Sequence, residues 1–159
     1  MPLSPRPASV SVTEMVQVVL PNDANPLGFI LGGTVMHLID IAGAIACHRH
    51  SRSRVVTAAV DDLVFLHPIK VGELILLRAR VTCTFTTSME VQVDVFSEEA
   101  LSGTRLLTSR AFLTFVAIDS EGGRVQVPPL LVETPEEQQV CEQAQARREQ
   151  RLSRRAETR

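Results

Sequence analysis

The segment from Phe29 to Cys47 constrains the fold of this chain most, because it is almost continuously apolar. It follows a turn-rich stretch at residues 21–28 and contains the pair Gly32-Gly33 and a carboxylate, Asp40. A helix that is apolar around most of its circumference lies either in a membrane or inside its own protein. Since a carboxylate within a membrane span is costly and the segment is barely long enough to span, we expect a buried helix over about residues 32–50.

Stretches with the character of β-strands lie on both sides of this helix. Strict alternation of apolar and polar residues, as in residues 89–95, is typical of a strand with one face in water. Several long strands in a row after the helix favour an antiparallel sheet. The predicted strands cover residues 10–20, 55–67, 74–85, 89–95 and 106–118.

A sheet must curve around a helix that is apolar on all sides in order to bury it. This is the arrangement of the hot-dog fold, an α+β fold in which an antiparallel sheet wraps one long central helix. A single such sheet leaves an edge strand exposed, so we expect pairing with a second copy. We predict a disordered lead over residues 1–8, a hot-dog domain over residues 9–131, and a C-terminal helix with an arginine-rich tail over residues 132–159.

The start of the C-terminal helix is indicated by Thr134-Pro135-Glu136-Glu137, which combines an N-cap residue, a proline at the first helical position and a glutamate at the third. The helix is expected to run to about residue 152. It ends in a run of arginines, which we interpret as a solvated face. These arginines are Arg147, Arg148, Arg151, Arg154 and Arg155.

Composition narrows the class of function. The formal net charge is -2 and the aromatic residues are six phenylalanines, so we expect neither a nucleic-acid nor a membrane partner. Cys47, Cys83 and Cys141 are far apart and odd in number, which predicts no disulfide and a cytoplasmic location. The proline-rich N-terminus does not resemble a signal peptide.

Two features of the apolar segment suggest chemistry. Gly32-Gly33 begins the helix, where free backbone N–H groups can face an anion and missing side chains let a ligand approach. Asp40 follows two turns later, and a buried carboxylate is costly unless it is partnered or used. The structural alternatives are a tight loop with positive φ at the glycines and a hydrogen bond from Asp40 into a dimer contact. We favour the functional interpretation of the two features together.

The segment resembles the acyl-CoA thioesterase (acyl-CoA hydrolase) family of the hot-dog fold, the type of the bacterial broad-specificity and brain enzymes. The family pattern is an Asn, two residues, a Gly, a Gly-Gly pair, and a Met four residues before an Asp. Further segments also match, so the resemblance covers roughly residues 10–148. The matching positions are Asn25, Gly28, Gly32-Gly33, Met36 and Asp40, with residues 56–61, 65–68, 71–73, 87–91, 115–119 and 127–130.

This resemblance implies an enzyme that hydrolyses acyl-CoA to free CoA and a carboxylic acid, with no cofactor apart from the CoA of the substrate and no metal. Asp40 would act as general base on water, and the N–H of Gly33 would hold the thioester oxygen. Asn25 of the facing protomer would position the water or the thioester. A dimer, assembled further into a trimer of dimers (a hexamer), is implied. The implied substrate contacts are Gly28, Gly32, Val60, Asp61, Thr87, Ser88 and Met89.

The chain departs from the family pattern at two positions. Phe85-Thr86 stands where the family often has Gly-Arg before Thr-Ser-Met, and that arginine can help to hold the nucleotide of CoA. Leu31 stands where an aromatic residue or a histidine often precedes Gly-Gly. The arginines of the tail could compensate for the first departure, although the solvated face remains the favoured interpretation.

The histidines of the helix and Ser88 are interpreted as structural rather than catalytic residues. His37 lies one turn before Asp40 and could form a dyad with it, but a place in the dimer interface is favoured. His48 and His50 are expected to cap the C-terminus of the helix rather than to bind a metal. Ser88 is not expected to be a nucleophile, because no Gly-x-Ser-x-Gly turn surrounds it.

Two other functions are compared with hydrolysis. A hot-dog hydratase needs a histidine five residues after the aspartate, and Ile45 stands there. Thioesterases with an aspartate at the position of Asn25 are disfavoured by that asparagine. A non-catalytic acyl-CoA-binding protein, a sensor or regulator, would keep the fold and lack a water-activating carboxylate, so Asp40 argues against it.

Overall fold

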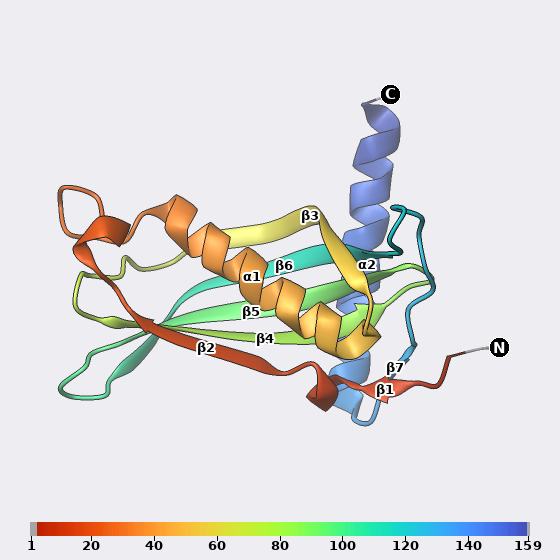
Figure 1. Ribbon diagram of the computed structural model, residues 1–159, viewed down its shortest axis with the longest axis horizontal. Coiled ribbons are helices and arrows are strands. Elements are labelled where there is room, and N and C mark those ends of the chain that lie inside the picture. The colour runs from red at the N-terminus through yellow and green to blue at the C-terminus, as the bar shows by residue number, and fades with distance from the viewer. Residues whose placement is uncertain (1–2, 159) are drawn as a thin grey trace.

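A curved antiparallel sheet with a helix on each face forms the computed structural model, which describes residues 3–158 (Figure 1). The sheet has five strands in the order β2-β4-β5-β6-β3. Helix α1 lies in the concave face, and helix α2 crosses the outer face near one end. The elements are β1 Arg6–Pro7, β2 Thr13–Val18, α1 Gly32–Ser51, β3 Arg54–Phe65, β4 Leu74–Thr84, β5 Ser88–Glu98, β6 Arg105–Ile118, β7 Leu130–Leu131 and α2 Pro135–Glu157, with short 3-10 turns at Ala8–Val10 and Pro21–Asp23.

The predicted central helix and the hot-dog fold are confirmed. Small residues on α1 let the sheet come close: Ala42 and Ala46 are fully buried, and a Cβ at Gly43 would lie 3.0 Å from the ring of Phe115. The helix ends where Arg52 adopts a left-handed conformation with φ of 54°. Burial is incomplete on one side, since Met36 near the start of α1 is 46% exposed in the single chain.

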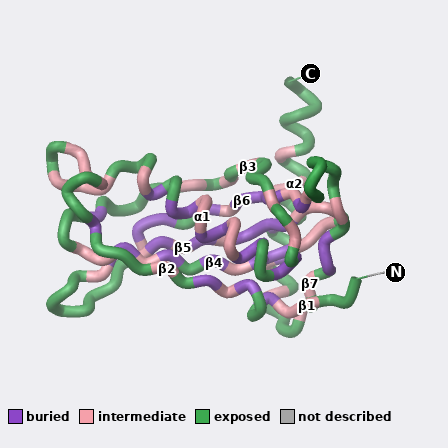
Figure 2. Tube along the Cα trace, viewed as in Figure 1, coloured by how far each residue is buried: buried purple, intermediate pink, exposed green. Residues whose placement is uncertain are grey.

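Strand β3 forms one edge of the sheet and is exposed over much of its length (Figure 2). Its pairing with β6 is interrupted between Thr57 and Ala59 and again between Asp61 and Val64. Apolar side chains on this edge remain in solvent, with Val60 46% and Val64 53% exposed. An edge strand of this kind is suited to pairing with another chain, as the sequence predicts.

The predicted disordered lead over residues 1–8 is not wholly disordered. Residues 6–7 form β1, which pairs in parallel with Leu130–Leu131, because Arg6 donates its backbone N–H to Pro129. The side chain of Arg6 also donates to the carbonyl oxygen of His50 at 2.7 Å. Residues 1–2 lie outside the described part of the chain. Within residues 3–158, no helix has the length and apolar character needed to cross a membrane.

The prediction of no disulfide is wrong. Cys83 of β4 and Cys141 of α2 form a disulfide bond, with their Cα atoms 4.8 Å apart. Their separation of 58 residues in sequence hides this proximity, because only the docking of α2 on the sheet brings them together. Cys47 is buried and free, and burial raises the pKa of its thiol.

Helix α2 is fastened to the sheet by polar contacts as well as by the disulfide. The N-cap prediction is supported, since Thr134 Oγ1 accepts the N–H of Glu137 at 3.1 Å. Arg147 donates from Nε and Nη2 to the buried carboxylate of Glu90, at 2.9 and 2.8 Å. The guanidinium of Arg147 also stacks 3.7 Å above the ring of Phe112. The arginine run is therefore not simply a solvated face, because part of it packs against the sheet.

Candidate functional site

A cavity of about 330 Å³ lies between the N-terminal half of α1 and β3. We call it the α1–β3 cavity. Its walls are mainly apolar, and Asp40 is the carboxylate among its lining residues. The lining residues are Gly33, Met36, His37, Ile39, Asp40, Thr57, Val60, Leu63 and Leu113. The structure thus brings Gly33, Asp40 and Val60 of the predicted site into one cavity.

Asp40 is half-buried and has a defined partner. Thr57 Oγ1 on β3 donates a hydrogen bond to Asp40 Oδ1 at 2.6 Å. This contact fixes the carboxylate and leaves Oδ2 without a hydrogen bond among the described residues. Sequence analysis did not identify Thr57 as a site residue, although it lies inside one of the matching segments. An oriented carboxylate with a free oxygen at an apolar wall can accept a proton from water.

The N-terminus of α1, two turns before this carboxylate, presents free backbone donors. The N–H groups of Thr34 and Val35 bond to the carbonyl oxygen of Leu31, at 3.0 and 3.1 Å. The N–H groups of Gly32 and Gly33 have no such bond within the described chain, and Leu31 offers no capping side chain. Free donors at a helix N-terminus favour an anionic or oxyanionic partner.

The glycine pair is not explained by backbone strain. Neither Gly32 nor Gly33 has a positive φ, so the tight-loop alternative is excluded. A Cβ at Gly33 would meet nothing within 4 Å, which leaves open space on that side. Gly32 instead lines a second apolar cavity of about 250 Å³, whose walls include Phe65 and Pro68. The pair therefore separates two cavities, with its free N–H groups between them.

Asn25 does not line the α1–β3 cavity. Its Oδ1 accepts the N–H groups of Leu27 and Phe29, at 3.0 and 3.1 Å, so its amide NH₂ is the part left to contact a ligand. Gly28, in the same loop, has φ of 85°, and its carbonyl oxygen accepts the N–H of Val71. Within one chain the structure does not bring Asn25 to Asp40, and its action across protomers stays a prediction.

The other predicted substrate contacts lie elsewhere. Asp61 faces α2, where its Oδ2 accepts from Arg151 Nη1 at 2.8 Å. Thr87 lies in the turn between β4 and β5, Ser88 is the first residue of β5, and the carbonyl oxygen of Thr87 accepts the N–H of Ala117. Met89 is fully buried in the core. The structure does not bring these residues together with Asp40 in one chain.

The histidines differ in their surroundings. His37 is exposed on the cavity wall and makes no hydrogen bond to Asp40. His48 Nδ1 lies 2.8 Å from the carbonyl oxygen of Ser53, beyond the helix end. The prediction that His50 caps the helix is wrong, because His50 is fully buried and its Nε2 contacts the carbonyl oxygen of Pro128 at 2.8 Å. Burial lowers the pKa of His50. Within residues 3–158 no cluster of three or more metal-ligating side chains occurs.

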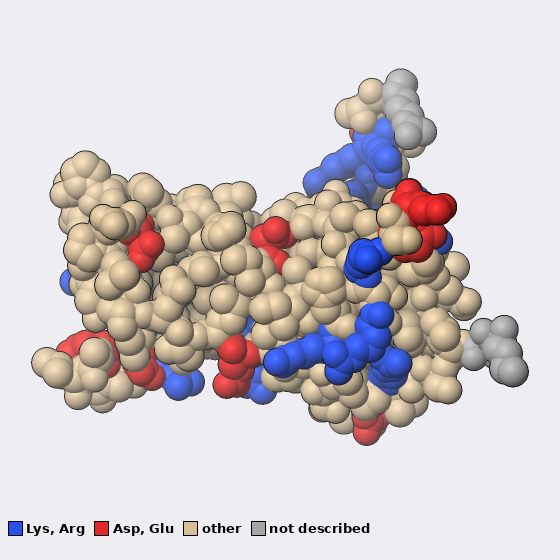
Figure 3. All heavy atoms as spheres, viewed as in Figure 1, with Lys and Arg blue, Asp and Glu red and all other residues tan. Residues whose placement is uncertain are grey.

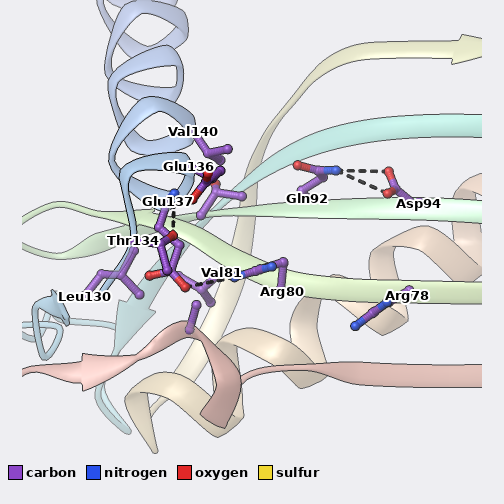
Figure 4. Close-up of a pocket in the computed structure, with 12 residues that line it drawn as sticks. Arg78, Arg80, Val81, Gln92, Asp94, Leu130, Thr134, Glu136, Glu137 and Val140 are labelled. Atoms are coloured by element: carbon purple, nitrogen blue, oxygen red, sulfur yellow. Dashed lines mark hydrogen bonds and ion pairs between the residues drawn. The ribbon is translucent and has the colours of Figure 1, made fainter. Parts of the chain in front are cut away.

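A larger pocket, of about 390 Å³, lies on the outer face of the sheet beside the start of α2 (Figure 4). Arg78, Arg80, Gln92 and Asp94 come from the sheet, and Glu137 comes from α2. Arg80 Nη2 lies 3.4 Å from Glu137 Oε1, and the amide of Gln92 donates to Asp94 at 3.2 Å. These groups largely satisfy one another on the face opposite α1, so the pocket is not part of the site around Asp40.

Comparison with known proteins places the chain in a family. Residues 27–104 match the model of the Thioesterase superfamily. The chain is 43% identical over 119 residues to the Uncharacterized acyl-CoA thioester hydrolase YkhA of Bacillus subtilis, covering 75% of this chain and 69% of that protein. It is 34% identical over 149 residues to the Cytosolic acyl coenzyme A thioester hydrolase of Homo sapiens. That match covers 91% of this chain but only 39% of the human protein.

Solved structures agree with the sequence relatives. An apo-hexameric acyl-CoA thioesterase superposes with a TM-score of 0.92 at 42% identity, over 97% of this chain and 99% of that chain. An acyl-CoA hydrolase of Staphylococcus aureus, in complex with butyryl coenzyme A, coenzyme A and coenzyme A disulfide, gives 0.88 at 35% identity, over 96% and 93%. Fold and site together define a hot-dog thioesterase. Within that class the chain belongs to the acyl-CoA thioesterase (acyl-CoA hydrolase) family, which confirms the resemblance.

Further structures of the Staphylococcus aureus hydrolase carry single alanine substitutions of an asparagine, an aspartate and a threonine. Those positions are separated by 15 and then 17 residues. Asn25, Asp40 and Thr57 have the same separations in this chain.

Proposed function

We propose that this protein hydrolyses acyl-CoA thioesters to free CoA and a carboxylic acid. The observation that carries the proposal is that Asp40, oriented by Thr57, and Gly33, with its free N–H group, line one cavity. A carboxylate base and an oxyanion donor are the two elements that thioester hydrolysis by water needs. The names of the relatives support this reaction.

In the proposed mechanism, Asp40 Oδ2 removes a proton from water as the water oxygen attacks the thioester carbonyl carbon. The carbonyl oxygen becomes an oxyanion that accepts the N–H of Gly33, with that of Gly32 beside it. The C–S bond then breaks, and the proton on Asp40 passes to the departing CoA sulfur. General base and oxyanion donor each contribute on the order of 10²-fold or more. The thioester is already activated, so the chemistry requires neither a metal nor a covalent nucleophile.

The complete site is proposed to form between protomers. Asn25 lies in a loop outside the α1–β3 cavity with its amide NH₂ free of hydrogen bonds to described residues, so a facing protomer can present it to Asp40. The exposed apolar edge of β3 supports a dimer. Assembly of those dimers into a hexamer is proposed because a structural neighbour at a TM-score of 0.92 is hexameric.

A cytoplasmic location is proposed from the cytosolic relative. The Cys83–Cys141 disulfide is unusual for a reducing cytoplasm. Alkylation of the thiols in freshly lysed cells, followed by mass spectrometry, tests the location. Two further alkylated cysteines beside Cys47 would agree with a reducing compartment. An intact disulfide throughout would contradict it.

The test of function is a steady-state assay of acyl-CoAs of graded chain length with detection of the released thiol. The wild-type protein should turn over at least one of them. Asp40→Asn should lose most of kcat, on the order of 10²-fold or more, and keep its fold. Glu99→Gln, a charge-matched control in an exposed loop, should keep wild-type rates. Stoichiometric binding without turnover would instead support the non-catalytic acyl-CoA-binding alternative.

A further inference from the structure

The α1–β3 cavity cannot by itself hold the charged end of the proposed substrate. CoA carries a diphosphate and a 3′-phosphate, which need cationic partners. None of the residues that line the cavity is an arginine or a lysine. The inference that follows rests on the proposed function and concerns where those phosphates bind.

A small polar cavity adjoins the α1–β3 cavity and contains arginines. It has a volume of about 100 Å³ and lies between β3 and α2. We call it the arginine cavity. Val60 lines both cavities, which lie on opposite sides of β3. The residues lining the arginine cavity are Val60, Asp61, Asp62, Arg147, Gln150, Arg151 and Arg154.

The three arginines of this cavity differ in the donors that they leave free. Arg147 donates from Nε and Nη2 to Glu90, and this contact attaches α2 to the sheet. Arg151 donates only from Nη1, to Asp61, although a guanidinium has five N–H donors. Arg154 has no carboxylate within ion-pair distance among residues 3–158. Arg151 and Arg154 therefore have donors available for an anion.

The charges of the arginine cavity itself are balanced, so attraction of an anion rests on the free donors of Arg151 and Arg154 and on the further arginines of α2. Arg147 is offset by Glu90 and Arg151 by Asp61, which leaves Arg154 facing Asp62. Arg148 and Arg155 follow on the same helix, so the C-terminal half of α2 is strongly basic. Figure 3 shows this gathering of basic side chains over the end of α2. The disulfide and the Glu90 contact hold the helix in position, which lowers the entropic cost of binding.

The spacing of the two cavities suits the length of the substrate. Thr57, which contacts Asp40, and Asp61, which contacts Arg151, are separated by about 13 Å along the strand. An extended pantetheine arm spans roughly 15 Å between its sulfur and the diphosphate, from ordinary bond lengths. The separation along β3 is therefore within the reach of the arm, which has to pass around the edge of the strand because Asp40 and the arginines lie on opposite faces of the sheet.

We propose that Arg151 and Arg154 bind the phosphates of the CoA nucleotide, and that this contact selects CoA thioesters over thioesters of small thiols. Arg154 is the cleaner position to test, because Arg151 also holds Asp61. Arg155→Gln provides a matched control, since it removes the same charge from the same helix without touching the arginine cavity.

The experiment compares one acyl group on two carriers, CoA and N-acetylcysteamine, which lacks phosphates. Arg154→Gln should raise KM for the acyl-CoA roughly tenfold with little change in kcat. It should leave kcat/KM for the N-acetylcysteamine thioester unchanged. Inhibition by adenosine 3′,5′-bisphosphate should weaken by a similar factor in Arg154→Gln and stay unchanged in Arg155→Gln.

The outcomes separate the two levels of the argument. A wild-type protein that hydrolyses neither carrier refutes the proposed function. Hydrolysis of both carriers with the same KM refutes the nucleotide contact and leaves the proposed function standing. The contact is also refuted if Arg154→Gln behaves as wild type. It is refuted as well if Arg155→Gln raises KM as much, since the overall positive charge of α2 would then explain the preference for CoA.

Discussion

Replacement of Thr57 by valine removes one hydrogen bond and almost nothing else. Thr57 Oγ1 donates to Asp40 Oδ1 at 2.6 Å, a short contact between a hydroxyl and a carboxylate. Valine has nearly the same shape and keeps the β-branched preference of the strand. Thr57 is exposed at the edge strand, so the variant should fold as the wild type does.

The magnitude follows from the kind of contact. A hydrogen bond to a charged group contributes about 1.5–3 kcal/mol, and exposure to solvent reduces this to about 1–2 kcal/mol. If the bond orients Asp40 for proton transfer, its loss appears in the barrier, because 1.36 kcal/mol corresponds to about tenfold in rate. Thr57→Val should therefore lower kcat by roughly 5- to 30-fold, with KM changed little.

The assay is steady-state hydrolysis of one acyl-CoA under saturating and limiting conditions. Thr57→Ser is the matched control, since it retains the donor and should keep most of kcat. An equal loss in the serine variant would assign the effect to the missing methyl group. A valine variant with wild-type kcat would show that Asp40 needs no orientation from β3, and the argument from the 2.6 Å contact would be wrong.

Other features of the structure give three further predictions. Burial lowers the pKa of His50 below its ordinary value of 6.5 in the folded state. The unfolded chain therefore binds the extra proton first, and stability falls as pH drops below about 6.5. Urea unfolding from pH 5 to 8 should show this loss of stability, and it should be smaller in His50→Gln. Reduction of the Cys83–Cys141 disulfide should lower the free energy of unfolding by about 4 kcal/mol for a closed loop of this length. Urea unfolding midpoints with and without dithiothreitol measure this loss, and the midpoint of Cys83→Ser should be the same in both conditions. Asn25→Ala and Asp40→Asn proteins, each nearly inactive, should recover about a quarter of wild-type activity when refolded together in equal amounts, since half of the dimers then contain one intact site; an inactive mixture with proven mixed dimers would refute a shared site.

The central helix was the part of the fold that sequence predicted best. Its start at Gly32 is as expected, and its end at Ser51 lies one residue beyond the predicted His50. This accuracy has a physical cause, because a long apolar run bounded by turns leaves little choice of register. Gly33 and Asp40 lie two turns apart on one helix, so their meeting at one cavity also follows from local geometry.

Strand β2 shows where pattern alone is insufficient. The alternation over residues 10–20 predicts a strand, but the strand begins at Thr13 after a 3-10 turn. The apolar face that the pattern detects points outward, since Val16 is 58% and Val18 is 48% exposed. Alternation shows that two faces differ, and only the packing of the sheet decides which of them meets the core.

Contacts between distant elements were not predictable from sequence. The Cys83–Cys141 disulfide and the pair Arg147–Glu90 both depend on how α2 crosses the outer face. No local pattern encodes the angle of that crossing. For the same reason the arginine run resembled a solvated face in sequence, while the structure divides it between attachment of the helix and an open anion site.

Strand β3 links the chemistry to the proposed nucleotide contact through one irregularity. Thr57 and Asp61 are four residues apart, and in a regular strand both side chains would point to the same face. The pairing with β6 shifts between Thr57 and Ala59, and a single extra residue reverses the side to which later residues point. Thr57 consequently reaches Asp40 on α1, while Asp61 reaches Arg151 on α2. Without the bulge, Thr57 and Asp61 would share one face, and Asp61 could not hold Arg151 on the outer face while Thr57 orients the base on the inner face.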